Sequence, residues 1–308
     1  MHSMEEGAGD IWVDGRFTPW AEAKVHILSY TFQHGAGVFE GVRAYDGARG
    51  PAIFRLYDHT RRLFDSAKIL GMEVPFSHEE VSAAQIDVVR RSGLKSCYIR
   101  PVCYYDGKTV GVSAAGNDTH LAIAAWAWDA YLGADAQEAG ITVKTSSYIR
   151  HHVNAVMGKA KANGHYINSM MAVMEARRSG YTDALMLDAQ GHVAECSTSN
   201  IFVIRNGEIV TPDRVNILEG ITRDTVMTLA ADRGLMVHER QLTRDELYCA
   251  DEIFVTGTAA EVTPVIAIDD RQIAAGTPGE ITRMMQAAYS ECVRGRDQKH
   301  LDWVTAVA

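Results

Sequence analysis

The sequence predicts an α+β protein of two domains, with antiparallel-rich sheets and flanking helices. The chain has 308 residues, which suits two domains of about 150 residues each. Strand-like runs meet at tight-turn dipeptides such as Asp14-Gly15 and Asn206-Gly207, which favour antiparallel hairpins. Helical patterns stand apart from these runs, so a regular βαβ array is not expected.

Composition and charge exclude several classes of protein. The apolar fraction is 47% and the charged fraction 22%, as in ordinary globular proteins. The net charge of −9, without a long block of like charge, argues against a nucleic-acid surface or an anionic membrane as partner. The sequence has neither a long apolar run nor an apolar signal core at its start. The five cysteines are scattered without ligand spacing, so we expect reduced thiols, a cytoplasmic location and no metal.

The predicted N-terminal domain covers residues 1–130 and is the smaller of the two. We expect a hairpin at 11–18, a short strand or turn at 24–30, and a second hairpin at 38–54 that turns at Asp46-Gly47. A helix over 57–70 ends at Gly71, and a second begins at the capping-box pattern of Ser77 and Glu80 and ends before Gly93. Strands are expected at 96–105 and 120–128.

Residues 131–140 are predicted to be a linker, because they are small and polar, and residues 141–308 a larger C-terminal, cofactor-binding domain. Its first strand is expected at 141–148 and its first helix at 164–179. A meander of strands follows. The expected strands are 184–187, 192–196, 200–204, 208–211, 252–256, 262–268 and 271–274, and the later helices are 221–233, 244–249 and 280–293.

The stretch Lys159-Ala160-Lys161-Ala162-Asn163-Gly164-His165-Tyr166 requires an explanation. A lysine is usually a surface residue whose charge lies in water. At the edge of a packed site, a lysine can instead lose its proton and form a Schiff base with a carbonyl cofactor. The second interpretation requires a carboxylate for a pyridinium nitrogen and a phosphate-binding cup elsewhere in the chain.

Candidates for both partners are present. Glu195 lies in a predicted strand; such a residue usually faces solvent, but beside a pyridine nitrogen its carboxylate would keep that nitrogen protonated. Residues 219–224 begin a helix whose free N–H groups suit a phosphate, and Thr222 adds a hydroxyl. A helix start of this composition is also common without a ligand. Residues 256–261 offer further hydroxyl and N–H groups, and Arg62 offers a full charge.

Taken together, these residues resemble branched-chain amino-acid aminotransferases of the fold-type IV, pyridoxal-phosphate-dependent class. The resemblance covers about residues 11–268, and its motifs are specific in combination. They are Val38-Phe39-Glu40-Gly41-Val42-Arg43, the helix 59–67, Tyr98-Ile99-Arg100-Pro101, Arg150-His151-His152-Val153-Asn154, Ala160-Lys161-Ala162-Asn163-Gly164, Gly220-Ile221-Thr222-Arg223, and 256–264.

The resemblance implies a role for each matching residue. Lys161 is the Schiff-base lysine and the acid–base group, and Lys159 is only its neighbour. The residues implied to bind the cofactor are Tyr166 at the ring hydroxyl, Glu195 at the ring nitrogen, and Arg62, Ile221, Thr222 and Thr258 at the phosphate. Those implied to bind the substrate are Tyr98, Thr258 and Ala259 at the α-carboxylate, Phe39, Tyr131 and Ala260 in the apolar pocket, and Arg100 at the side-chain carboxylate of glutamate.

The resemblance also implies a reaction and an assembly. The cofactor would be pyridoxal 5'-phosphate, and the amino group would pass from a branched-chain or related hydrophobic L-amino acid to 2-oxoglutarate in a ping-pong reaction. The enzyme would be a homodimer or larger, because a loop of one subunit completes its neighbour's pocket. Neither nucleic acid nor membrane is an expected partner.

Three departures from the family pattern leave the substrate open. His34 replaces a tyrosine that helps Arg100 to bind glutamate. The glycine-rich run after the ring-nitrogen acid is replaced by Cys196-Ser197-Thr198-Ser199, and the loop 105–112 also differs. These are either neutral changes or signs of a shifted amine-donor range, since histidine at 34 resembles relatives that accept (R)-amines.

Four hypotheses follow from these observations. The first is an L-branched-chain aminotransferase, and the second is a fold-type IV transaminase for D-amino acids or (R)-amines. The third, a lyase resembling aminodeoxychorismate lyase, would leave Arg100 without an evident use. The fourth, a non-catalytic protein that keeps the cofactor fold, conflicts with the intact Lys161, Tyr166 and Glu195.

Overall fold

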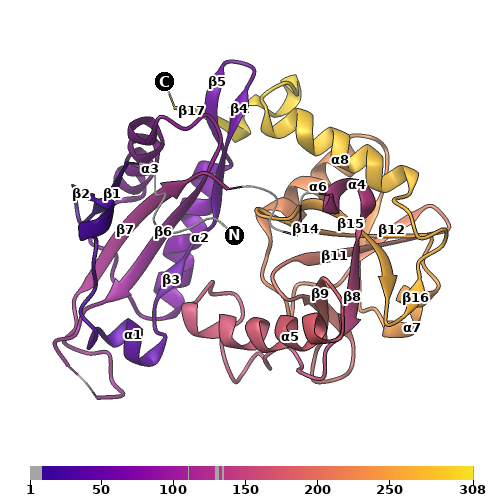
Figure 1. The fold of residues 1–308 in the computed structure, drawn as a ribbon, viewed down its shortest axis with the longest axis horizontal. Helices are drawn as coiled ribbons and strands as arrows, with labels where there is room; N and C mark the ends of the chain where they lie inside the picture. The colour runs from indigo at the N-terminus through magenta and orange to yellow at the C-terminus, as the bar shows by residue number, and fades with distance from the viewer. Residues whose placement is uncertain (1–8, 110, 129–131, 134, 308) are drawn as a thin grey trace. The chain divides into compact units, whose positions relative to one another are not determined.

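The computed structural model describes residues 9–109, 111–128, 132–133 and 135–307. The described residues form two compact units. Unit 1 takes those of Met1–Trp128, Ala160–Gly164 and Glu291–Ala308, and unit 2 takes those of Asp129–Lys159 and His165–Ser290. Figure 1 shows the order of the elements along the chain.

Unit 1 is built on an antiparallel sheet, which its described residues form in the order β17-β5-β4-β6-β7-β1-β2, with β3 paired to β6. The strands are β1 (Asp10–Val13), β2 (Arg16–Pro19), β3 (Val38–Phe39), β4 (Val42–Gly47), β5 (Gly50–Phe54), β6 (Cys97–Tyr105), β7 (Thr119–Trp126) and β17 (Val304–Ala306). The first predicted hairpin is confirmed, with Asp14 and Gly15 at φ 46° and 88°.

The predicted turn at Asp46-Gly47 is wrong. Asp46 pairs with Pro51 and Gly47 with Gly50, so β4 continues through the dipeptide and the chain turns at 48–49. Gly50, at φ 100°, adopts the left-handed conformation that allows this turn, because glycine lacks a Cβ.

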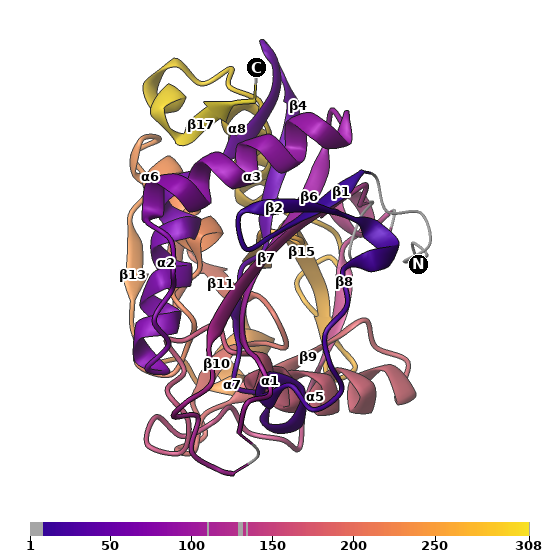
Figure 2. The same cartoon turned by 90° about the vertical axis from the view of Figure 1, so that its left-hand side faces the viewer.

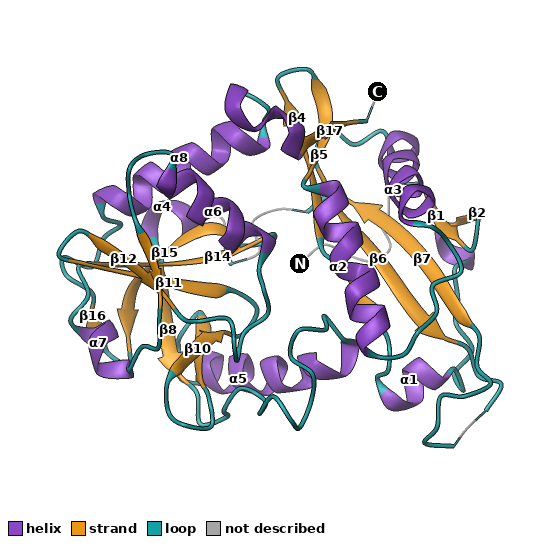
Figure 3. Cartoon of the chain, turned by 180° about the vertical axis from the view of Figure 1, so that it is seen from behind, coloured by secondary structure: helices purple, strands orange, loops and turns teal. Residues whose placement is uncertain are grey.

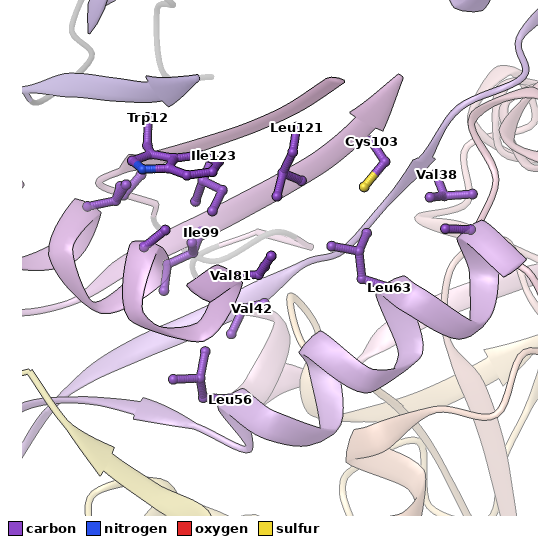
Figure 4. Close-up of a cluster of buried hydrophobic side chains, with 14 of the residues drawn as sticks. Trp12, Val38, Val42, Leu56, Leu63, Val81, Ile99, Cys103, Leu121 and Ile123 are labelled. Atoms are coloured by element: carbon purple, nitrogen blue, oxygen red, sulfur yellow. The ribbon is translucent and has the colours of Figure 1, made fainter. Parts of the chain in front are cut away.

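Helices α2 (Leu56–Ile69) and α3 (His78–Ser92) pack against each other beside this sheet (Figure 2). Figure 4 shows Leu56 and Leu63 of α2 and Val81 of α3 directed toward Ile99 and other strand residues in one core. The predicted ends of α3 are confirmed, since Ser77 and Glu80 form a capping box and Gly93 is left-handed at φ 68°.

Several short elements of unit 1 were not predicted. They are η2 (Trp20–Glu22), α1 (Tyr30–His34), η4 (Gln298–Trp303) and β17, and the predicted strand at the start of the second hairpin is divided into β3 and β4. Of the strand or turn expected at 24–30, the structure forms a turn, in which the Ser29 amide donates to the His26 carbonyl oxygen at 2.8 Å. Ser29 Oγ accepts a hydrogen bond from the Phe32 amide and caps α1. The missed strand β17 is short and pairs with residues distant in sequence, so local pattern carries little signal for it.

Unit 2 is built on a mixed sheet, which its described residues form in the order β10-β9-β8-β15-β14-β11-β12-β13, with β16 paired to β15. The strands are β8 (Ile141–Thr145), β9 (Asp183–Leu187), β10 (Val193–Cys196), β11 (Asn200–Arg205), β12 (Glu208–Thr211), β13 (Val237–Glu239), β14 (Glu252–Gly257), β15 (Glu261–Ile268) and β16 (Arg271–Gln272). β11 pairs antiparallel with β12 across the predicted Asn206-Gly207 turn, and β14 pairs antiparallel with β11 and β15. β10 and β11, predicted as successive strands of a meander, are separated in the sheet by β9, β8, β15 and β14. Phe202 and Phe254 stack at its centre with ring centroids 4.9 Å apart.

Figure 3 shows the helices of unit 2. They are α4 (Ala136–Ala139), α5 (Tyr166–Arg178), which follows η3 (Asn163–His165), α6 (Ile221–Ala231), α7 (Arg244–Tyr248) and α8 (Glu280–Val293), which ends in unit 1. Ala172 and Ala176 of α5 are buried against Ala184 and Met186 of β9, and α6 packs on β14. Among the described helices, none is long and apolar enough to cross a membrane.

The two units divide the chain differently from the predicted domains 1–130, 131–140 and 141–308. The region predicted as a linker contains α4. Residues 160–164 and 291–308 lie with unit 1, because Ala162 bridges β3 and β17 pairs with β5. These are pairings between distant parts of the chain, which composition along the sequence does not reveal.

Candidate functional site

Lys161 lies in a short extended segment that is hydrogen-bonded to unit 1. The Phe39 amide donates to the Lys161 carbonyl oxygen at 3.0 Å, and the Lys161 amide donates to Ser66 Oγ at 3.0 Å. Ala160 and Ala162, on either side, are buried. Successive side chains of an extended segment point to opposite faces. The Lys161 side chain is half-buried, and its Nζ lies 5.2 Å from the centre of the Phe39 ring.

Lys159 lies in unit 2 and has a different environment. Its half-exposed side chain lies 3.2 Å from the Glu219 carboxylate, and it donates to the carbonyl oxygens of Arg214 and Ile217. An exposed ion pair of this kind is the ordinary state of a surface lysine. The surface interpretation therefore applies to Lys159.

Arg62 of α2 forms a buried cluster with two residues that carried no predicted role. Its Nε and Nη2 donate to the Glu40 carboxylate at 2.6 and 2.9 Å. Nδ1 of His59 lies 2.8 Å from the same carboxylate, and Glu40 and His59 are almost fully buried. The two-pronged pair fixes the plane of the guanidinium group.

Burial and charge set the protonation of this cluster. Burial alone would raise the pKa of Glu40, but the charge of Arg62 and the hydrogen bond from His59 outweigh it and hold the pKa far below its ordinary value. Burial lowers the pKa of His59 despite the adjacent carboxylate. His59 is therefore neutral near pH 7 and donates from Nδ1, while Arg62 and Glu40 are both charged.

Phe39, Tyr98 and Arg100 lie together in unit 1. The guanidinium carbon of Arg100 is 4.6 Å from the Phe39 ring centre and 5.4 Å from that of Tyr98. Its Nε is buried and has no hydrogen-bond partner among the described residues. Gly41 leaves space for the tyrosine hydroxyl, since a Cβ on it would fall 1.8 Å from that oxygen. This part of unit 1 combines aromatic rings with the Arg100 guanidinium group.

Glu195, the predicted ring-nitrogen acid, is 4% exposed in β10 of unit 2. Arg150 Nε lies 2.7 Å from its Oε1, and Asn200 Nδ2 donates to its Oε2 at 3.1 Å. The Leu218 amide donates to the same oxygen at 3.3 Å. An ion pair and two N–H donors favour the ionised carboxylate at this buried position.

The other residues predicted in unit 2 adjoin the same edge of its sheet. Asn200 begins β11 and is paired in register with Thr256 near the end of β14. Thr258, Ala259 and Ala260 form the turn that follows β14. Asn200 Nδ2 also donates to the Leu218 carbonyl oxygen at 3.0 Å. Leu218 lies shortly before α6, which begins with Ile221 and Thr222.

Three predicted residues remain to be placed. Tyr166 is the first residue of α5. His34 is exposed at the end of α1 and stacks on Tyr30, with ring centroids 4.3 Å apart. Tyr131 lies outside the described residues. Their roles stay predictions.

Fold and residues together define the class of this protein. The chain belongs to amino-transferase class IV, whose family model matches residues 37–268. It is 50% identical over 305 residues to the branched-chain-amino-acid aminotransferase of Pseudomonas aeruginosa, with 99% of each chain covered. The predicted family and fold type IV are thereby confirmed.

Two solved structures are also similar. The Escherichia coli branched-chain amino acid aminotransferase has a TM-score of 0.96 at 40% identity, with 98% of this chain and 100% of that chain covered. The branched-chain amino acid aminotransferase from Thermobaculum terrenum, solved in its PLP form, has a TM-score of 0.93 at 37% identity, with 98% and 99% covered.

The residues present fit pyridoxal 5'-phosphate. Unit 1 offers a directed lysine amine and a charged guanidinium group, and unit 2 offers an ionised carboxylate and a helix N-terminus. The buried hydroxyls of Ser199 and Thr256 have no hydrogen-bond partner among the described residues, as expected where a polar ligand binds. Within each unit, these groups are of the kinds that an aldehyde, a ring nitrogen or a phosphate requires of its partners.

Sequence reasoning assigned no role to Glu40, His59, Arg150 or Asn200. Glu40 and Arg150 belong to motifs that carried the family resemblance, and Asn200 ends the altered run after Glu195. A charged residue inside an otherwise apolar run, as Glu40 is, was the available signal. Its partners on α2 could not be identified, because the pairing depends on tertiary structure.

Proposed function

We propose that this chain is a pyridoxal 5'-phosphate-dependent branched-chain amino-acid aminotransferase that passes the amino group to 2-oxoglutarate. The observation that carries the proposal is the buried Glu195 carboxylate, paired with Arg150, in a chain that also places Lys161 Nζ 5.2 Å from the centre of the Phe39 ring. The similarity to curated branched-chain enzymes over almost the whole chain supports the substrate class.

Each side chain then has a defined task. When bound, the cofactor supplies an electron sink for negative charge at the substrate's α-carbon. The side-chain amine of Lys161 would move the proton between that carbon and the aldehyde carbon of the cofactor. Glu195 holds a proton on the ring nitrogen, and Tyr166 donates to the ring hydroxyl. The phosphate is bound by Arg62, Thr258 and the N–H groups of Ile221 and Thr222.

Substrate recognition uses both charge and shape. Tyr98, Thr258 and Ala259 hold the α-carboxylate. Phe39, Tyr131 and Ala260 form the apolar pocket for a branched side chain. Arg100, with His34, binds the second carboxylate of glutamate or 2-oxoglutarate. The amino acid gives up its amino group and leaves as an oxo acid before 2-oxoglutarate binds and accepts that group. The first product therefore leaves before the second substrate binds.

A single-turnover experiment tests this function. The loaded enzyme is mixed in turn with L-leucine, L-glutamate, D-alanine and an (R)-arylalkylamine, and the visible absorbance of the cofactor is followed. Fast loss with L-leucine and L-glutamate is expected. Loss with only D-alanine or the amine would instead identify the alternative specificity that His34 and the 196–199 run left open.

A pair of lysine variants tests the catalytic assignment. Lys161→Ala should abolish turnover, whereas Lys159→Ala should leave it nearly unchanged, because Lys159 forms a half-exposed ion pair. Retained turnover by the Lys161 variant would contradict the mechanism.

We infer that the chain forms a dimer with a second copy of itself through α5 of unit 2. α5 exposes an apolar stripe at helical spacing, with Ile167, Met170, Met171 and Met174 exposed by 63%, 48%, 38% and 41%. A contiguous apolar stripe of this kind marks an interaction surface. Dimerisation, which the family resemblance implies, would bury this apolar stripe.

Sedimentation velocity tests the dimer. Met170→Glu should shift the protein toward monomer, because a charge would be buried in the interface. Met236→Glu is the matched control, since Met236 is an exposed methionine outside α5. A monomeric wild type, or equal behaviour of both variants, would contradict the proposal.

A further inference from the structure

We propose that Asn200 is a positioning residue that ties the carboxylate of Glu195 to the start of α6 and so sets the spacing between the ring-nitrogen and phosphate anchors. The inference rests on the proposed function for the identity of those anchors. Its structural basis lies entirely within unit 2.

The amide nitrogen of Asn200 has two acceptors. Nδ2 donates to Glu195 Oε2 at 3.1 Å and to the Leu218 carbonyl oxygen at 3.0 Å. A primary amide has two N–H donors, so both are used. The side chain is 5% exposed, and neither acceptor is easily replaced by water. One amide group therefore connects β10 to the loop before α6.

The amide oxygen of Asn200 faces Gly220, the N-cap of α6. A Cβ built on Gly220 would fall 2.0 Å from Oδ1, well inside contact distance. The backbone of Gly220 is extended, at φ −69° and ψ 130°, a conformation that any residue adopts. Glycine at 220 is thus required by the space that Asn200 occupies rather than by its backbone angles.

Together these contacts define a short rigid path. It runs from the Glu195 carboxylate through the Asn200 amide to Gly220, whose carbonyl oxygen accepts from the Asp224 amide at 3.0 Å in the first turn of α6. The N–H groups of Ile221 and Thr222 in that turn are the phosphate donors of the proposed function. The Leu218 amide donates to Glu195 at 3.3 Å and so links this carboxylate to the loop before α6 a second time. A change at Asn200 should therefore disturb both anchors together.

Three probes separate the two anchors in binding titrations of the apoprotein. Pyridoxal 5'-phosphate reports both anchors, pyridoxal lacks the phosphate, and 1-deazapyridoxal 5'-phosphate lacks the ring nitrogen. The wild type should prefer the complete cofactor over each analogue. Asn200→Ala should weaken binding of the complete cofactor about tenfold and reduce both preferences, because it removes a charge-assisted hydrogen bond to Glu195 and a neutral one to the Leu218 carbonyl oxygen.

Thr211→Val is the matched control. Thr211 is fully buried in the same sheet, and its hydroxyl donates to the Ile201 carbonyl oxygen on β11 at 2.8 Å. The variant removes one buried hydrogen bond beside Asn200 without touching Glu195 or residues 218–220. It should lower stability but leave both cofactor preferences unchanged. Equal loss of affinity for all three probes in Asn200→Ala would overturn the inference.

Gly220→Ala gives a second, independent test at a position that is not buried. In the wild-type background it should weaken cofactor binding about tenfold, and in the Asn200→Ala background by much less, because the clashing oxygen is gone. Strictly additive effects would contradict the proposed contact. A wild type with no preference for the complete cofactor would instead refute the proposed function.

Discussion

Arg100 shows how one residue is prepared for a charged substrate. Its guanidinium group lies over Phe39 and Tyr98, and its buried Nε has no hydrogen-bond partner among the described residues. A buried donor that lacks a partner is costly. In the proposed function, the second carboxylate of glutamate or 2-oxoglutarate would supply the missing acceptor and relieve this cost.

We therefore expect Arg100→Met to separate the two half-reactions. Rates with L-glutamate and 2-oxoglutarate should fall at least about tenfold, because a charge-assisted hydrogen bond contributes about 1.5–3 kcal/mol. The half-reaction with L-leucine should change little. The measurement is single-turnover kinetics with each amino acid.

Arg43→Met serves as the control, because Arg43 lies on the neighbouring strand with its guanidinium carbon 5.1 Å from the Tyr45 ring centre. It should leave both half-reactions nearly unchanged. Equal losses with leucine and glutamate in the Arg100 variant would show that Arg100 supports the fold rather than the second carboxylate.

The Glu40 cluster makes unit 1 sensitive to acid. The pKa values of His59 and Glu40 both lie below their ordinary values of 6.5 and 4.5. The unfolded chain then binds protons that the folded chain does not, so stability falls as the pH decreases. The contribution of His59 is present above pH 6.5 and is lost below it, and that of Glu40 is present above pH 4.5 and is lost below it.

Urea unfolding of the apoprotein over a pH series checks this expectation. Glu40→Gln should be less stable near neutral pH, because Arg62 loses its charged partner, and its stability should fall less steeply in acid. Asp58→Asn removes the ion pairs to Arg55 and Arg61 at the start of α2, and it measures how far the loss of ion pairs alone lowers stability near neutral pH. An unchanged slope in the Glu40 variant would contradict the assigned pKa shift.

At the scale of elements, α3 is specified locally at both ends. The Ser77 hydroxyl accepts from the Glu80 amide at 3.2 Å, and the Glu80 carboxylate accepts from the Ser77 amide at 2.7 Å. Gly93 ends the helix in the left-handed conformation. Both signals lie within a few residues of the helix ends, so they are readable from sequence.

Ser77→Ala should lower the free energy of unfolding by about 1 kcal/mol, because a helix N–H loses its acceptor. Chemical denaturation of the apoprotein measures the loss. Ser77→Asp retains an acceptor and should remain close to the wild type. If both substitutions have the same effect, the capping bond is not the source of the stability.

At the scale of the whole molecule, the C-terminal segment completes the N-terminal unit. β17 pairs with β5, and the Arg55 amide donates to the Trp303 carbonyl oxygen at 2.7 Å. Arg55 also stacks over the Trp303 ring at 4.6 Å. Unit 1 is therefore incomplete until the end of the chain has been added.

Removal of residues 298–308 should destabilise unit 1 selectively. Hydrogen exchange should show lost protection in β5 and at the start of α2, because β5 becomes an unpaired edge. β11, in the centre of the sheet of unit 2, should retain its protection. Equal loss of protection in β5 and β11 would mean that the two units do not unfold independently.

Sequence alone determined the elements whose signals are local. The hairpin at Asp14-Gly15, both ends of α3 and the hairpin of β11 and β12 at Asn206-Gly207 follow from turn chemistry and capping. The family resemblance added Lys161 and Glu195, and with them the aminotransferase class. These motifs are carried by residue types at fixed spacings, which a sequence displays directly.

Tertiary structure alone decided which residues surround those motifs. Glu40 is 22 residues from Arg62, Arg150 is 45 residues from Glu195, and the C-terminal β17 reaches back to β5. A buried charge that lacks an opposite charge is costly, and so is a strand edge whose backbone N–H and C=O groups lack hydrogen bonds. Each of these pairings avoids such a cost. A sequence displays which residues are charged, but only the folded chain determines which of them are removed from water together.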